Sequence, residues 1–184
     1  MIEKRQRKSI RLKEFDYSQP GEYFVTICTK NHNCIFGSIV SGKMDLNDRG
    51  KIVDRCWKGI LEHFSNVELD EYVVMPNHIH GILILNESVV GTRHAVSLPE
   101  RFGRPVSDSV STIVRSFKSA VTKRINEMHL TGDAQFWQPR YYDRIIRSEN
   151  ELQNIRDYIA NNVVTWAFDK ENPEDVPLFL QSEK

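Results

Sequence analysis

The chain has 184 residues, which is enough for one domain with a sizeable hydrophobic core, and we expect residues 1–184 to form a single domain. No apolar run is long enough to cross a bilayer and no signal-peptide core is present, so we expect a cytoplasmic protein with no membrane partner. The net charge is zero, but residues 1–16 form a basic arm and residues 167–184 an acidic tail, and this segregation is compatible with a nucleic-acid-binding face.

The first expected elements are two strands. Alternating aromatic and β-branched residues predict a strand over residues 22–30, and residues 34–40 are expected to pair with it as a hairpin. Three cysteines without CxxC spacing predict reduced thiols rather than disulfides. Cys28, His32 and Cys34 straddle the predicted turn, and their closeness in sequence allows a zinc site as a second interpretation of this segment.

The rest of the chain alternates between strand and helix periods. We expect a helix capped near residues 46–48 and running to about residue 64, strands over 67–75 and 78–85, a loop over 87–106, a helix from 108 or 109 to about 128, a strand over 141–147 and a helix over 149–162. This order predicts an α+β fold of the ferredoxin-like kind, with an antiparallel sheet, helices packed on one face and an additional C-terminal helix.

Two histidines open the predicted strand 78–85. Because side chains alternate along a strand, His78 and His80 face the same side of the sheet and Ile79 faces the other. Two imidazoles on one face of a rigid strand can hold one divalent cation, provided that another part of the chain supplies a third ligand. Such a pair is also compatible with two surface histidines that bind nothing.

The predicted helix 149–162 carries a second polar pair. Tyr158 and Asn162 are four residues apart and therefore share one helix face. A tyrosine hydroxyl can attack a phosphate that a metal has polarised, and the Asn162 amide oxygen is a candidate third ligand beside the two histidines. On spacing alone, a core aromatic is the more frequent role for a residue placed like Tyr158, and Asn162 would then be a residue that ends the helix.

These residues carry a resemblance to a known family. Residues 75–81, Met-Pro-Asn-His-Ile-His-Gly, resemble the HUH motif of the single-tyrosine transposases of insertion sequences and their REP-associated relatives. Residues 136–147 resemble the block before the family's catalytic helix, and residues 156–162 resemble that helix. The strand at 23–26 and the helix at 117–119 also fit, so the resemblance covers nearly the whole chain. One departure is that Val163 follows Asn162, where the family often has proline, and this changes how the helix ends.

The resemblance implies a metal-dependent single-strand DNA endonuclease and strand transferase. A divalent cation, magnesium or manganese, would be held by His78, His80 and Asn162, and Tyr158 would attack to form a 5′-phosphotyrosine and a free 3′-hydroxyl. The implied partner is single-stranded or hairpin DNA, and the family leaves both a monomer and a homodimer open. Basic side chains are expected to hold the DNA backbone: Arg5, Arg7, Lys8, Arg11, Lys13, Arg115 and Lys118.

Three alternatives stay open at this point. The first is a DNA-hairpin-binding protein that no longer cleaves, although both histidines and the tyrosine are present. The second is a metal-dependent hydrolase whose nucleophile is water, which would leave no covalent protein–DNA adduct. The third is a structural protein with a histidine pair on its surface.

Overall fold

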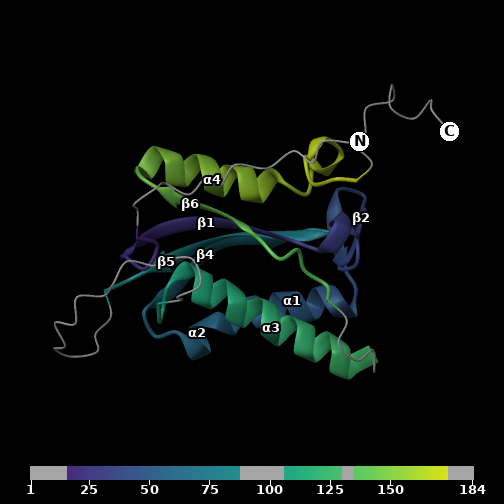
Figure 1. The fold of residues 1–184 in the computed structure, drawn as a ribbon. Coiled ribbons are helices and arrows are strands. Elements are labelled where there is room, and N and C mark those ends of the chain that lie inside the picture. Colours follow the sequence, from purple (N-terminus) through teal and green to yellow (C-terminus); the bar gives the residue numbers. More distant parts are fainter. Residues whose placement is uncertain (1–15, 88–105, 130–134, 174–184) are drawn as a thin grey trace, which may run out of the picture.

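A four-stranded antiparallel sheet forms the centre of the computed structural model, which describes residues 16–87, 106–129 and 135–173. Its strands lie in the order β4-β5-β1-β6 (Figure 1). Their bounds are Gly21–Cys28 for β1, Val67–Val74 for β4, His78–Leu85 for β5 and Tyr142–Ile146 for β6. This strand order, with a helix between β1 and β4 and another between β5 and β6, is the ferredoxin-like arrangement, and it confirms the predicted fold class.

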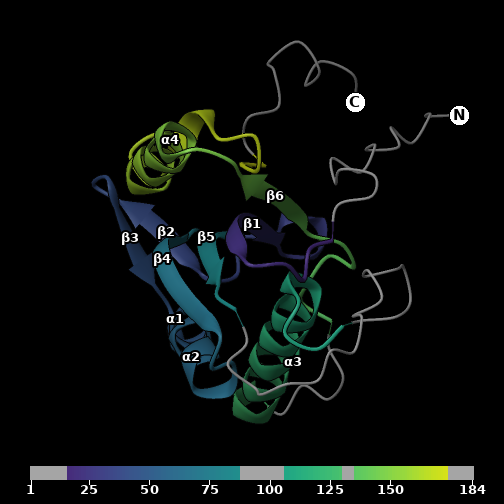
Figure 2. The same cartoon turned by 90° about the vertical axis from the view of Figure 1, so that its left-hand side faces the viewer.

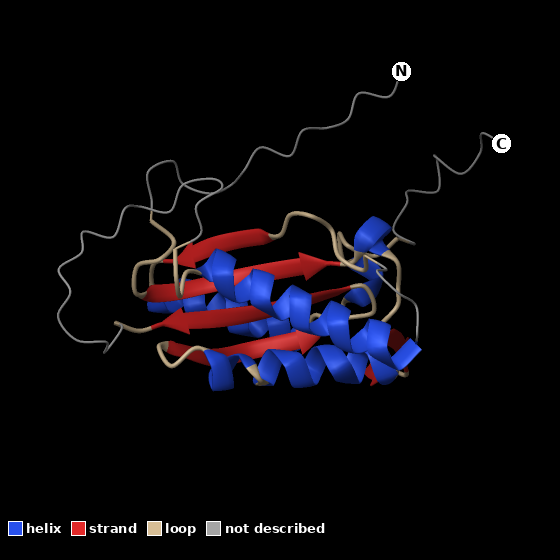
Figure 3. Cartoon of the chain, turned by 60° about the horizontal axis from the view of Figure 1, so that its bottom comes forward, coloured by secondary structure: helices blue, strands red, loops and turns tan. Residues whose placement is uncertain are grey.

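Helices cover the two faces of the sheet unequally. Figure 1 and the end view in Figure 2 place α1, α2 and α3 on one face and α4 alone on the other, and Figure 3 shows the helices of the first face lying across the strands. Their bounds are Asp48–Lys58 for α1, Ile60–His63 for α2, Val110–His129 for α3 and Glu149–Asn161 for α4. Within these residues, no helix is long and apolar enough to cross a membrane.

The alternation of side chains along the central strands separates two clusters. In β1, Val25 and Ile27 face the helices α1 and α3, whereas Phe24 and Thr26 face α4. The larger cluster includes Trp57, and a Cβ on Gly81 would lie 2.3 Å from its Cζ2 atom, so only glycine fits at this position in β5. The smaller cluster, under α4, consists of Phe24, Ile82, Ile146, Leu152 and Ile159.

The long helix α3 agrees closely with its prediction. The six side chains that the apolar period places on one face are all buried: Val110, Ile113, Val114, Phe117, Val121 and Ile125. Of the two candidate caps, Ser109 accepts a hydrogen bond from the backbone N–H of Thr112 through its hydroxyl, at 3.3 Å. The apolar period of this helix is therefore sufficient to predict its buried face.

Two local predictions are wrong. Residues 34–40 do not pair with β1, because β5 and β6 occupy both of its edges; instead β2 (Gly37–Val40) pairs with β3 (Lys43–Leu46) in a separate hairpin. The helix expected to reach residue 64 is interrupted at Gly59, and Leu61, which lies beyond this interruption, is 49% exposed. Its cap is as predicted, since the Asn47 side chain accepts from the N–H of Gly50 at 3.0 Å.

Candidate active site

His78 and His80 lie side by side on the face of β5 that α4 covers. Their ring centroids are 4.4 Å apart, and both side chains are buried. In the register of the sheet they stand opposite Cys28 and Thr26 of β1, so the pair rests on a central strand rather than on an edge. The prediction that the two rings share one face is confirmed.

A hydrogen bond fixes which nitrogen of His78 is free. The Asn77 amide nitrogen donates to the carbonyl oxygens of His32 and Glu171, at 3.0 and 2.6 Å, so its Oδ1 faces His78. The 2.8 Å contact between that oxygen and His78 Nδ1 therefore requires a hydrogen on Nδ1. Nε2 therefore carries an unshared lone pair, and this buried atom has no hydrogen-bond partner among the described residues. Such an arrangement is typical of a metal-ligating histidine.

Asp169 completes the histidine pair and was not predicted. Its Oδ2 lies 4.0 Å from Nε2 of His78, and one ligand atom from each of His78, His80 and Asp169 lies within 4.8 Å of the other two. The predicted ligand Asn162 is buried next to it and donates from Nδ2 to Asp169 Oδ2 at 2.9 Å. The Oδ1 atom of Asn162 is buried without a hydrogen-bond partner among the described residues. This oxygen is therefore a second buried atom, besides Nε2 of His78, whose missing interaction a bound cation could supply.

The electrostatics keep both rings neutral. Burial, with a smaller contribution from His32, lowers the pKa of His78 to about 3. Burial also lowers the pKa of His80 well below its usual value, helped by His78 and opposed by the Asp169 carboxylate. A neutral imidazole is the form that ligates a cation, so Nε2 of His78 keeps its lone pair throughout the neutral pH range. Both nitrogens of His80 contact hydroxyls, Nδ1 that of Thr26 at 2.8 Å and Nε2 that of Tyr158 at 3.2 Å, so a cation at His80 would displace one of these contacts.

Tyr158 reaches this cluster from α4. Its hydroxyl lies 3.2 Å from Nε2 of His80, and its ring is 5.2 Å from the His80 ring. The side chain is 46% exposed, so the hydroxyl is placed between the buried site and the surface. Burial, followed by the charge of Asp169, raises the pKa of Tyr158 to about 12. The phenol is therefore protonated at neutral pH unless a cation in the site stabilises the phenolate.

The backbone after α4 turns back to deliver Asp169. The helix ends at Asn161, and the Thr165 hydroxyl donates to the carbonyl of Asn161 at 3.0 Å. A short 3-10 helix, η2 (Trp166–Phe168), follows and brings the Trp166 ring to 5.9 Å from His78. Asn162 and Val163, the latter at the position where the family often has proline, are part of this turn.

The other predicted residues lie elsewhere. Arg115 is exposed on α3, across the sheet from the histidines, and Lys118 donates from Nζ to the carbonyl of Gln138 at 2.6 Å. Burial lowers the pKa of Lys118 to about 8. Arg5, Arg7, Lys8, Arg11 and Lys13 lie outside the described residues. Of the two neighbouring tyrosines, Tyr141 packs against the larger cluster and Tyr142 against the smaller one, so only Tyr142 is on the same face as the site.

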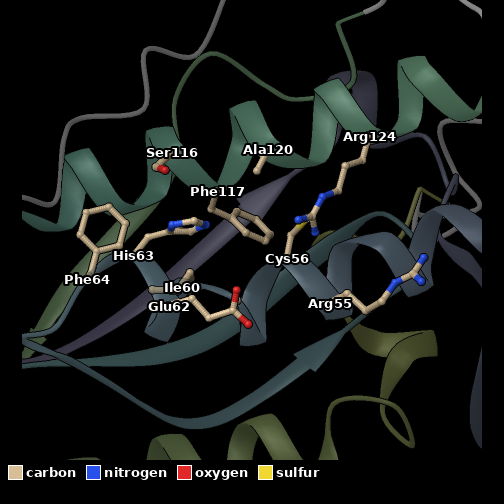
Figure 4. Close-up of a pocket in the computed structure, with 11 residues that line it drawn as sticks. Arg55, Cys56, Ile60, Glu62, His63, Phe64, Ser116, Phe117, Ala120 and Arg124 are labelled. Atoms are coloured by element: carbon tan, nitrogen blue, oxygen red, sulfur yellow. The ribbon is translucent and has the colours of Figure 1, made fainter.

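A pocket between α1, α2 and α3 lies on the opposite face of the sheet (Figure 4). Cys56, His63, Phe117 and Arg124 are among its lining residues, and Arg124 donates to the Cys56 sulfur at 3.2 Å. None of the residues predicted for the site lines it. The chemistry suggested by the histidines, Asp169 and Tyr158 therefore belongs to the α4 face alone.

Comparison with known proteins identifies the family of the chain. The model of the family described as IS200-like transposases matches residues 102–162, which include α3, β6 and α4. An uncharacterized protein of Haemophilus influenzae is 41% identical over 170 residues, which are 89% of this chain and 92% of that protein. A solved structure of a REP-associated tyrosine transposase bound to a REP hairpin shares the fold, with a TM-score of 0.56 and 21% identity over 89% of this chain and 76% of the other.

The fold and these matches define the class as a transposase of the HUH, single-tyrosine kind. The chain belongs to the IS200-like transposase family, and its function on DNA is transposase-like. The family resemblance is thus confirmed, and the matched segment includes residues 156–162 but not residues 75–81. This family generally uses a divalent metal, and the cluster of His78, His80 and Asp169 is a group that can hold one.

Proposed function

We propose that the protein is a metal-dependent single-strand DNA endonuclease and strand transferase that acts through a 5′-phosphotyrosine on hairpin-associated DNA. The observation that carries this proposal is the meeting of Tyr158 with the histidine pair. A hydroxyl 3.2 Å from His80 stands beside the bare Nε2 of His78 and the Asp169 carboxylate. A nucleophile and a set of cation ligands are thus on one face of one sheet.

The donor set fits a divalent cation with mixed nitrogen and oxygen ligands. We assign His78, His80 and Asp169 as ligands, with Asn162 beside them as either a fourth ligand or the group that orients Asp169. Oxygen ligands from Asp169 and Asn162 favour magnesium or manganese. When bound, the cation would polarise the scissile phosphate and neutralise charge that develops on its oxygens.

The protein's own contribution is to position Tyr158 for its attack on the phosphate and for the reverse reaction. Its Oη forms a bond to phosphorus while the bond from phosphorus to the 3′ oxygen breaks. The phenolic proton is lost, and the departing 3′ oxygen takes up a proton, so the step is balanced. Attack on the phosphotyrosine by another 3′-hydroxyl reverses these changes and joins two strands without an external energy source.

A single copy of the chain contains every residue of this proposed site. Tyr158 contacts His80 of the same chain. The Arg156 guanidinium fixes α4 by a bidentate ion pair with Asp70 of β4, from Nε to Oδ1 at 3.2 Å and from Nη2 to Oδ2 at 2.6 Å. We therefore infer that cleavage occurs in cis and that a homodimer is not required to complete the site.

The substrate assignment rests on the family and on the solved relative, which was bound to a REP hairpin. We propose that this chain likewise binds single-stranded DNA next to a hairpin, and that the basic arm and the cations of α3 contact its backbone. Such contacts predict binding that weakens as salt rises. The site gives no support to the alternative of a non-cleaving hairpin-binding protein, because Tyr158 contacts His80, one of the cation ligands that we assign.

The test is the formation of a covalent adduct. Purified protein is incubated with manganese and an oligonucleotide that carries a hairpin and is labelled on the 3′ side of the cleavage region, and products are separated under denaturing conditions. We expect a labelled protein band with manganese and none with chelator. Strand cleavage without any adduct would favour the water-using hydrolase, and hairpin binding without cleavage would favour the binding protein.

A further inference from the structure

A second group of metal-ligating side chains lies next to the proposed active site. Cys28 ends β1, His32 belongs to the 3-10 helix η1 (Lys30–His32), and Glu171 follows η2. Glu171 Oε2 is 3.6 Å from the Cys28 sulfur and 3.0 Å from Nδ1 of His32. All three ligand atoms lie within 4.8 Å of one another.

The backbone around this group is held in an uncommon conformation. Asn31 and His32 have φ values of 57° and 55°, in the left-handed region that non-glycine residues seldom adopt. The Asn77 side chain ties both halves together, because its Nδ2 donates to the carbonyls of His32 and Glu171. This local strain turns His32 back toward Cys28 and is compensated by a specific, buried amide.

A polar atom in the group lacks a proper partner. Nδ1 of His32 is buried and, despite its short distance to Glu171, forms no hydrogen bond of acceptable geometry among the described residues. Nδ1 of His32 and Oε2 of Glu171 are therefore close together without a directed hydrogen bond, as two ligands of one metal ion would be.

We propose that Cys28, His32 and Glu171 bind a zinc ion, with water in the fourth position. Thiolate, imidazole and carboxylate are the three ligand types that zinc prefers. Ideal tetrahedral bonds would separate sulfur from oxygen by about 3.5 Å and nitrogen from oxygen by about 3.3 Å. The observed separations of 3.6 and 3.0 Å are close to these values.

Binding requires one change at His32. Gln138 presents its amide nitrogen to Nε2 of His32 at 2.8 Å. A histidine that ligates through Nδ1 carries its hydrogen on Nε2, and a half-turn of the Gln138 amide would accept that hydrogen through Oε1. One rotation of the Gln138 amide thus supplies the outer hydrogen bond of a zinc-ligating histidine.

The zinc site differs in chemistry from the proposed catalytic site, although one segment serves both. Asp169 faces the histidine pair and Glu171 faces Cys28, and the N–H of Glu171 donates to Asp169 Oδ1 at 2.7 Å. Zinc would therefore hold the segment that carries Asp169 against the end of the sheet. Only the second site contains a thiolate, so the two sites can be separated by spectroscopy.

The experiment uses cobalt as a zinc probe on the full chain. We expect one equivalent of cobalt to produce a thiolate-to-cobalt charge-transfer band in the near ultraviolet, and one equivalent of zinc to remove it. Cys28→Ser should lose the band. Cys34→Ser is the matched control, because Cys34 is exposed and outside the group, and it should keep the band.

Two further variants make the outcome decisive. His78→Ala should keep the band, because His78 is not one of the three proposed zinc ligands. Glu171→Gln, which retains the shape of the side chain, should weaken cobalt binding by about tenfold or more. Absence of the band in the wild type, its survival in Cys28→Ser, or its loss in Cys34→Ser would overturn the proposal, and each result is independent of whether the protein cleaves DNA.

Discussion

The two faces of the sheet have different tasks. Toward α1 and α3, β5 presents Ile79 and Leu83, which belong to the larger apolar cluster. Toward α4, the same strand presents His78 and His80 before it reaches the smaller cluster at Ile82. The strand period of two is what allows one strand to stabilise the fold with alternate residues and to build a site with the others.

On the α4 face, side chains of the proposed site contain buried polar atoms without partners in the described part of the chain. Beneath α4, buried nitrogen and oxygen atoms of His78 and Asn162 are left without hydrogen-bond partners among the described residues, which is a cost to folding. The larger cluster on the other face can offset that cost. We therefore expect substitutions on the α4 face to affect activity most, and those on the α1–α3 face to affect stability most.

The largest effect is expected at His78. His78→Ala should lower the single-turnover rate of hairpin-DNA cleavage by about a thousandfold or more, because it removes a ligand of the cation that stabilises the transition state. Its thermal unfolding should stay cooperative. Measuring the cleavage rate and the thermal unfolding on one preparation separates an effect on activity from an effect on stability. A variant that fails to fold would contradict the different roles of the two faces.

A matched pair of substitutions in β5 compares the faces directly. Ile79→Ala should reduce the free energy of unfolding by about 4 kcal/mol and Ile82→Ala by about 2 kcal/mol, since a cavity under the single helix α4 can collapse more easily. Both side chains are fully buried. Urea unfolding gives the two values, and a larger loss for Ile82→Ala would reverse our comparison.

The pH dependence of the free energy of unfolding should report on the buried imidazole of His78. His78 has a pKa of about 3 in the folded state and near 6.5 when unfolded, so between these values the unfolded state binds the additional proton. Metal-free protein should lose stability as the pH falls through this window, by up to about 1.4 kcal/mol per pH unit. His78→Gln should flatten the curve, and an unchanged slope would argue against a neutral, buried His78.

The smallest effect concerns Asp169. Asp169→Asn should raise the manganese concentration needed for half-maximal cleavage by about tenfold, because it replaces a charged ligand with a neutral one. Asp157→Asn, an exposed carboxylate on α4, serves as the control and should leave the requirement unchanged. Equal behaviour of the two variants would remove Asp169 from the ligand set.

Periodicity predicted the parts of the molecule that local sequence determines. The alternation in β1 and β5 and the inward face of α3 follow from patterns within each element, and so does the shared face of His78 and His80. The hairpin β2–β3 was missed because both strands are short and half-exposed, which leaves little apolar alternation to read.

The ligands beyond α4 could not be predicted in this way. Asp169 and Glu171 lie in a stretch that composition marks only as an acidic tail. Their positions depend on the turn after Asn161 and on hydrogen bonds to Asn162 and Asn77, which join residues far apart in the sequence. For the same reason, the sequence suggested Cys34 as the third member of the second cluster, whereas the structure places Glu171 beside Cys28 and His32.

The most direct test of the central claim is to locate the residue that carries DNA after cleavage. Trypsin would release Tyr158 in the peptide 157–170 and both Tyr141 and Tyr142 in the peptide 141–144, so mass spectrometry distinguishes them. Our account predicts the nucleotide adduct on the peptide 157–170, and its loss in Tyr158→Phe but not in Tyr142→Phe. An adduct on the peptide 141–144, or one that persists in Tyr158→Phe, would contradict it.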